Sequence, residues 1–128
     1  MNNEFELLKK KQEEYFRSGK TLPVKARIES LNKLKEAMKA NETLLLDALE
    51  HDLGKTHFEG YETELGVVYS EINHLIKHTR KWAKKERVST PLAHFPSSSY
   101  IRKEPKGNVL VMSPWNYPVQ LALNPLAA

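Results

Sequence analysis

The sequence has 128 residues, of which 40% are hydrophobic and 28% charged, an ordinary composition for a folded chain with a modest core. No apolar run approaches the roughly 20 residues of a membrane helix, and the mixed charges at the N-terminus do not fit a signal peptide, so we expect a cytoplasmic protein without a membrane segment. The chain contains no cysteine, which excludes disulfides, thiol nucleophiles and thiolate metal ligands within these residues.

A net charge of +4 invites a search for nucleic-acid binding. Charges of both signs are mixed along most of the chain, and one stretch is strongly basic: Lys77, His78, Arg80, Lys81, Lys84, Lys85 and Arg87. It is not interleaved with the glycine and aromatic residues that stack on bases. We interpret it as a solvated helix end, where cations suit the helix dipole, rather than as a phosphate-binding patch, and expect no nucleic-acid partner.

Hydrophobic periodicity predicts four helices before residue 86. The first carries its apolar residues on one face: Phe5, Leu8, Tyr15 and Phe16. Gly19 can end this helix in a left-handed cap, and Thr21 can cap a second helix with Pro23 in its first turn. The second helix repeats apolar residues at spacings of three and four: Val24, Ile28, Leu31, Leu34 and Met38.

A third helix is expected to start at Asn41 and to end at Gly54, with a leucine at every fourth position: Leu45, Leu49 and Leu53. The fourth helix is the longest, and its apolar stripe alternates spacings of four and three: Tyr61, Leu65, Val68, Ile72, Leu75, Thr79 and Trp82. Such a stripe must pack against another element. Glu62 and Glu64 point about 160 degrees apart, so we interpret both as helix surface rather than as an acid–base pair.

One group on the fourth helix has the spacing of metal ligands. Glu71, His74 and His78 are three and four residues apart, and two histidines with one carboxylate can hold a metal. They lie away from the apolar stripe, however, and no fourth ligand is placed near them. We therefore interpret them as an exposed polar flank and expect no metal site.

The pattern changes after Arg87. The stretch VSTPLAHFPSSSY, residues 88–100, is typical of an extended surface connector, residues 100–104 alternate as a strand does, and Lys106–Gly107 suggests a reversal or bulge. Residues 108–112 form an apolar run typical of a strand buried on both faces of a sheet. Because at most one other strand is predicted, the neighbours that this strand needs are missing.

The apolar run leads through a loop to a predicted helix. Pro118 marks one candidate start of this helix and Pro125 a second, and most of the residues after Pro118 are apolar. A strand, a loop and a helix form half of a parallel crossover unit, which requires a further strand downstream. The sequence therefore predicts a piece of a larger α/β protein.

The loop itself, MSPWNYP at residues 112–118, encloses Asn116 between two prolines. The carboxyl end of a parallel strand is where open α/β sheets bind ligands. There an asparagine amide offers N–H donors that suit negative charge developing on a carbonyl oxygen. The alternative is that Asn116 is a helix cap or a turn residue.

The stretch PKGNVLVMSPWNYPVQLALNPLAA at residues 105–128 resembles the NAD(P)-dependent aldehyde dehydrogenases. RSGKTLPVKARIESLNKLKEAM, ALEHDLGKTHFEGYETELGVVYSEI and YIRKEPKGNV are similar to the N-terminal part of the class 3, fatty-aldehyde-like branch. The resemblance implies an α/β fold whose N-terminal part this chain supplies. The implied division is a helical layer at 1–88, a connector and bridging strand or hairpin at 89–107, and the truncated start of a Rossmann-like cofactor domain at 108–128.

The resemblance also implies roles for the loop. Asn116 helps to form the oxyanion hole for a cysteine thiohemiacetal, Ser113, Pro114 and Trp115 lie along the nicotinamide end of NAD or NADP, and Tyr117 faces the aldehyde channel. The full-length parent is expected to be a homo-oligomer, a dimer, that oxidises aldehydes to carboxylic acids. Because the family's nucleophilic cysteine is missing from these 128 residues, we expect them to be inactive alone. The alternative is a helical protein-interaction or regulatory module.

Overall fold

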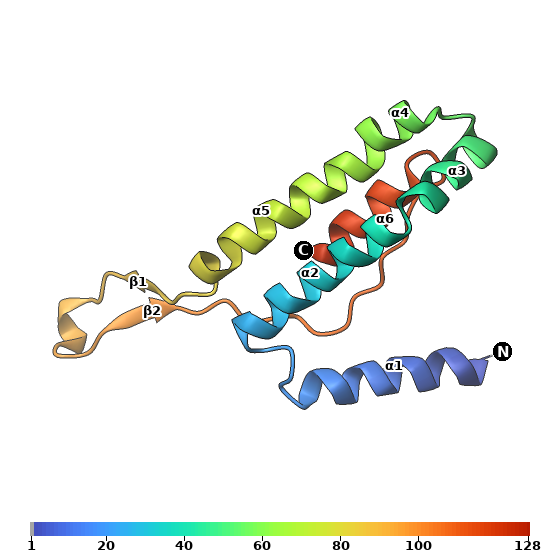
Figure 1. Ribbon diagram of the computed structural model, residues 1–128. Coiled ribbons are helices and arrows are strands. Elements are labelled where there is room, and N and C mark those ends of the chain that lie inside the picture. The colour runs from blue at the N-terminus through green and yellow to red at the C-terminus, as the bar shows by residue number, and fades with distance from the viewer. Residues whose placement is uncertain (1) are drawn as a thin grey trace.

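Helices account for most of the chain in the computed structural model, which describes residues 2–128. The α-helices are α1 (Asn2–Arg17), α2 (Val24–Ala40), α3 (Glu42–Leu53), α4 (His57–Gly60), α5 (Gly66–Trp82) and α6 (Pro118–Ala127). A π-helical turn, η1 (Tyr61–Leu65), joins α4 to α5, and a 3-10 turn, η2 (Leu92–His94), lies in the connector. Figure 1 shows a two-stranded arm projecting from the group of helices that includes α2, α3, α5 and α6.

The predicted helix ends are mostly confirmed. Gly19 and Gly54 adopt the left-handed conformation, with φ of 73° and 66°, as expected of residues that follow a helix. The prediction that Thr21 caps the second helix is wrong: Pro23 is the N-cap residue of α2, and within residues 2–128 the buried Thr21 Oγ1 has no hydrogen-bond partner. The tight turn after Gly19, closed by the bond from Leu22 N to Gly19 O, makes the helix begin beyond Thr21's reach.

The fourth predicted helix starts earlier than its apolar stripe and contains a π-helical turn. Thr56 caps α4 by accepting a hydrogen bond from Glu59 N at 3.2 Å. The chain then continues through η1 into α5 without a break. Gly66 suits the end of η1, because a Cβ there would lie 2.9 Å from the carbonyl oxygen of Tyr61. A larger residue at this position would force the π-helical turn to shift.

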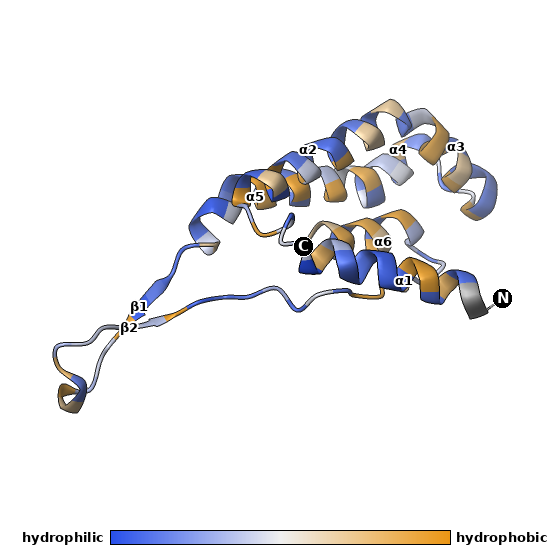
Figure 2. Ribbon diagram, turned by 90° about the horizontal axis from the view of Figure 1, so that it is seen from below, coloured by the Kyte–Doolittle hydropathy of each residue, from blue (hydrophilic) through white to orange (hydrophobic). Residues whose placement is uncertain are grey.

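The hydrophobic core lies between α2, α3, η1 and α5. Its buried members are Leu31, Met38, Leu46, Leu49, Leu65, Val68, Tyr69, Ile72 and Leu75. These residues include the central part of the predicted stripe, which is thereby confirmed, whereas Tyr61 and Trp82 at its two ends are exposed. Figure 2 shows the apolar faces of the helices turned toward one another. Tyr69 donates a hydrogen bond to Glu42 at 2.8 Å, which links α5 to the start of α3.

Helix α6 packs against the same core although it comes last in the chain. Val119, Leu123 and Ala127, each four residues apart, pack against the core. Pro118 begins the helix as predicted, whereas Pro125 lies inside it and does not start a second one. Because α6 packs on α5 and η1, the end of the chain is anchored in the helical layer. The division into three parts stays a prediction.

The arm is an antiparallel pair of β1 (Glu86–Val88) and β2 (Ser99–Ile101), in which Arg87 lies opposite Tyr100. The predicted strand at 100–104 is confirmed only in its first two residues, and residues 89–98 form the tip of the arm. Figure 1 shows the arm leaving the helices and the chain then returning along them to α6. The predicted division placed residues 86–88 in the helical layer, and the bridging role of the hairpin stays a prediction.

Residues 108–112 do not form the predicted buried strand. The structure describes all five, and none is part of a strand; Val109 and Leu110 are 75% and 80% exposed. A strand's backbone amides and carbonyls need a neighbouring strand, and among the described residues only 86–88 and 99–101 pair, with each other. Within residues 2–128, the apolar run at 108–112 therefore has no sheet to join.

The apolar face predicted for the first helix is also largely exposed. Phe5 is 71% exposed, while Phe16 is half-buried close to Gly107. The side chain of Asn108 donates a hydrogen bond to the carbonyl of Lys9 at 3.3 Å, so α1 is attached to the returning chain rather than to the core. Across residues 2–128, no helix combines the length and the apolar character needed to span a membrane.

These exposed residues lead to a first prediction. We expect the 128-residue chain to bind the hydrophobic dye ANS and to sediment as more than a monomer, because exposed apolar patches favour association. Replacing Val109 and Leu110 together with serine should reduce both signals, whereas Lys103→Ser, an exposed change nearby, should leave them unaltered. A monodisperse monomer that binds no dye would contradict this prediction.

Candidate functional site

The loop at residues 112–118 is folded back on itself at the start of α6. The hydroxyl of Ser113 donates to the carbonyl of Pro118 at 2.9 Å, which draws the two ends of the loop together. Trp115, near its centre, is 82% exposed. Asn116 and Tyr117 follow directly and lead into the first turn of the helix. The loop is thus fixed at its ends and presents Trp115 to solvent.

Beneath the loop lies a buried ion pair. Lys55 Nζ donates to Glu64 Oε1 at 2.6 Å, and the side chains are 10% and 0% exposed. Lys55 directly follows Gly54, which ends α3, and Glu64 belongs to η1. Burial of two charges is tolerated only where they are paired and their remaining hydrogen-bonding capacity is satisfied. Both conditions hold here because each group has further partners.

Glu64 caps α6 from a distant part of the chain. Its Oε2 accepts hydrogen bonds from the backbone amides of Val119 at 2.8 Å and Gln120 at 3.3 Å. The first amides of a helix have no partner within the helix, and a carboxylate there also suits the helix dipole. The N-cap residue of α6 is Tyr117, which makes no capping bond through its side chain. The side chain of Glu64 therefore caps the N-terminus of α6.

Lys55 holds the residues just before the helix. Its Nζ donates to the backbone carbonyl of Asn116 at 3.0 Å and lies 3.9 Å from the centre of the Tyr117 ring. An ammonium group at this distance from an aromatic face is attracted to the ring. Lys55 thus contacts a carboxylate, a carbonyl and an aromatic ring at the same time.

The Asn116 side chain is left free by this arrangement. It is exposed, and in the part of the chain that the structure describes its amide makes no hydrogen bond. The helix-cap interpretation of Asn116 is wrong, because Glu64 already binds the amides that a cap would serve. The backbone of Asn116 is fixed, while its two side-chain N–H donors remain available to a ligand.

The interpretation of Glu64 as helix surface is also wrong. Its spacing to Val68 and Ile72 is four and eight residues, which places it on the apolar stripe, so the sequence did contain a signal for its burial. Glu62 is exposed, as predicted. Lys55 had no such signal, because its burial depends on contact with residues 116 and 117.

The structure does not support a metal site at Glu71, His74 and His78. The rings of His74 and His78 lie 4.2 Å apart, and His78 stacks on Trp82 at 5.4 Å, so they form an aromatic ladder along α5. No cluster that could hold a metal ion occurs among residues 2–128.

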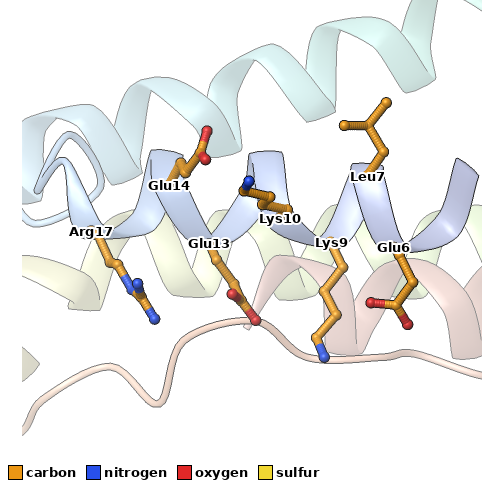
Figure 3. A pocket seen from close by; sticks show the side chains of 7 residues that line it. All are labelled: Glu6, Leu7, Lys9, Lys10, Glu13, Glu14 and Arg17. Carbon is orange, nitrogen blue, oxygen red and sulfur yellow. The ribbon is translucent and has the colours of Figure 1, made fainter. Parts of the chain in front are cut away.

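A hollow of about 510 Å³ lies along α1, and Figure 3 shows its charged lining projecting from that one helix. It includes none of the loop residues.

Comparison with known proteins identifies the family of the chain. A protein-family model described as "Aldehyde dehydrogenase family" matches residues 3–128, nearly the whole chain. The chain belongs to the aldehyde dehydrogenase family. The resemblance seen in the loop and in the helical segments is therefore confirmed.

Individual aldehyde dehydrogenases agree with this assignment. The 4,4'-diaponeurosporen-aldehyde dehydrogenase of Staphylococcus aureus is 44% identical over 88% of this chain and 24% of its own length. Aldehyde dehydrogenase family 3 comG of Dictyostelium discoideum is 43% identical over 94% of this chain and 26% of its own. Family 3 member B1 of Bos taurus is 44% identical over 88% and 24%. The chain thus spans about a quarter of the length of these relatives, and the class 3 prediction is confirmed.

The fold agrees with that of a solved aldehyde dehydrogenase. A structure of Staphylococcus aureus AldH in its substrate-bound state matches 98% of this chain and 27% of its own, with a TM-score of 0.95 and 41% identity. The predicted fold class, the N-terminal part of the aldehyde dehydrogenase fold, is therefore confirmed. The arrangement of helices, arm and loop is that of the family.

Proposed function

We propose that these residues form the N-terminal portion of an NAD(P)-dependent aldehyde dehydrogenase that oxidises aldehydes to carboxylic acids. The observation that carries the proposal is the free amide of Asn116 on a fixed backbone, within a chain of this family. A donor held in place before the reaction stabilises negative charge on the carbonyl oxygen without reorganisation. Asn116 is the residue that we assign to this role.

The neighbouring residues suit one end of a dinucleotide. Pro114 and the exposed indole of Trp115 offer a flat apolar surface of the kind that a nicotinamide ring contacts, and Ser113 keeps the loop closed beside them. We assign these three residues to NAD or NADP, which accepts a hydride when bound, and Tyr117 to the wall of the aldehyde channel. The Tyr117 ring is held by Lys55, so it forms a fixed boundary.

The exposed surfaces support an assembly of more than one chain. The projecting arm and the apolar residues Val109 and Leu110 favour contact with further polypeptide, and we propose a homo-oligomer, a dimer, for the whole protein. A cytoplasmic location stays a prediction.

A hybrid enzyme tests the proposed function. These 128 residues replace the matching part of Staphylococcus aureus AldH, and formation of NADH or NADPH is followed with aliphatic aldehydes. We expect the hybrid enzyme to oxidise aldehyde and the 128 residues alone to be inactive, because they have no cysteine to form the thiohemiacetal. AldH lacking the segment is the control and should be inactive. A folded hybrid without activity would favour the interaction module instead.

A further inference from the structure

Lys55 and Glu64 are the charged residues that are buried within residues 2–128. Their ion pair contacts the chain on both sides of Tyr117: Lys55 binds the carbonyl of Asn116, and Glu64 binds the amides of Val119 and Gln120. The direction of the Asn116 side chain depends on the orientation of its own backbone. Two residues that come more than 50 positions earlier thus bind the backbone at and just after Asn116.

We propose that Lys55 and Glu64 are positioning residues for Asn116, which hold its side-chain amide where an aldehyde oxygen can accept from it. The proposal rests on the proposed function and adds to it. A donor contributes most when its geometry is set in advance, and misplacement by about 1 Å can reduce the rate about 100-fold. Without Lys55, the Asn116 carbonyl would have no fixed partner and the peptide could rotate.

The ion pair could act instead through charge, because a lysine near the reacting oxygen would attract negative charge. Glu64 lies 2.6 Å from Lys55 and largely cancels that field. The two mechanisms predict opposite results for Glu64→Gln. Removing the carboxylate would expose the lysine charge and raise turnover if charge were decisive. If the pair acts by positioning, the same change loosens Lys55 and lowers turnover.

The first test uses kcat and KM of the hybrid enzyme. We expect Lys55→Met and Glu64→Gln each to lower kcat about 10- to 100-fold, with little change in KM for aldehyde or dinucleotide. If Lys55 acts through Asn116, then Lys55→Met should have almost no further effect in a hybrid that already carries Asn116→Ala. Equal losses in both backgrounds, or a rise in kcat for Glu64→Gln, would overturn the proposal.

A second variant separates positioning from folding. The double change Lys55→Met/Glu64→Gln removes both charges, keeps similar volumes and leaves the glutamine oxygen to accept from α6, so we expect a folded chain that is more stable than either variant with one buried charge left unpaired. The Asn116 carbonyl still lacks its donor. We therefore expect this variant to keep the kcat defect. A folded double variant whose kcat stays within about twofold of the hybrid enzyme would contradict the proposal.

The third measurement does not depend on activity. Backbone ¹⁵N relaxation of the 128-residue chain should show lower order parameters at Asn116 and Tyr117 in the double variant, while Glu62→Ala, an exposed change in the same turn, should leave them unaltered. Unchanged order at both residues would overturn the inference even if the hybrid enzyme were inactive. By contrast, normal turnover in Asn116→Ala would contradict the proposed function and not the contacts of Lys55.

Discussion

Replacing Asn116 by alanine in the hybrid enzyme should lower kcat by about 100- to 1000-fold, which corresponds to about 2.7 to 4 kcal/mol of lost transition-state stabilisation. The reason is the loss of the donor that we propose for the developing oxyanion. The affinity for NAD or NADP should stay nearly intact, because the dinucleotide is assigned to Ser113, Pro114 and Trp115. Steady-state aldehyde oxidation and dinucleotide titration measure the two quantities.

Asn116→Asp sharpens this test. Aspartate has nearly the same shape as asparagine, but its negative charge would repel the oxyanion, so we expect a folded and almost inactive enzyme. Neither change should shift the melting temperature much, because the Asn116 side chain makes no hydrogen bond with the described residues and Glu64 caps the helix. An aspartate variant that is both stable and active would rule out the oxyanion role.

Replacing Glu64 by alanine should cost about 3 to 5 kcal/mol of the free energy of unfolding. Lys55 would remain buried without its carboxylate, and the amides of Val119 and Gln120 would lose their acceptor. Urea denaturation of the 128-residue chain, followed by tryptophan fluorescence at a fixed protein concentration, measures this loss. Glu64→Gln should lose less, since it keeps an acceptor for the amides.

Glu62→Ala is the matched control for this measurement. It removes the same side chain from the same π-helical turn, but Glu62 is exposed and we expect a change within about 0.5 kcal/mol. Equal effects of the two substitutions would show that the burial of Glu64 contributes nothing to stability.

The sequence by itself was sufficient for several local features, although the local prediction of a Thr21 cap was wrong. Gly19 and Gly54 end helices because glycine adopts a left-handed conformation without steric cost, and the central apolar stripe of the fourth predicted helix packs because its spacing matches the helical period. The stretch around Asn116 was recognisable because it is contiguous: two prolines, two aromatic residues and an amide lie within seven positions.

Only the tertiary structure decided how the backbone of Asn116 is held. The contacts that matter join Lys55 to residue 116 and Glu64 to residue 119, across 61 and 55 positions, and no local pattern specifies such pairs. The run at 108–112 also depends on distant residues. Its composition suits a buried strand, but its backbone has no neighbouring strand within residues 2–128. Helices form from bonds within one segment, whereas a strand, a buried ion pair and a cap supplied from elsewhere require partners that folding brings from distant parts of the chain.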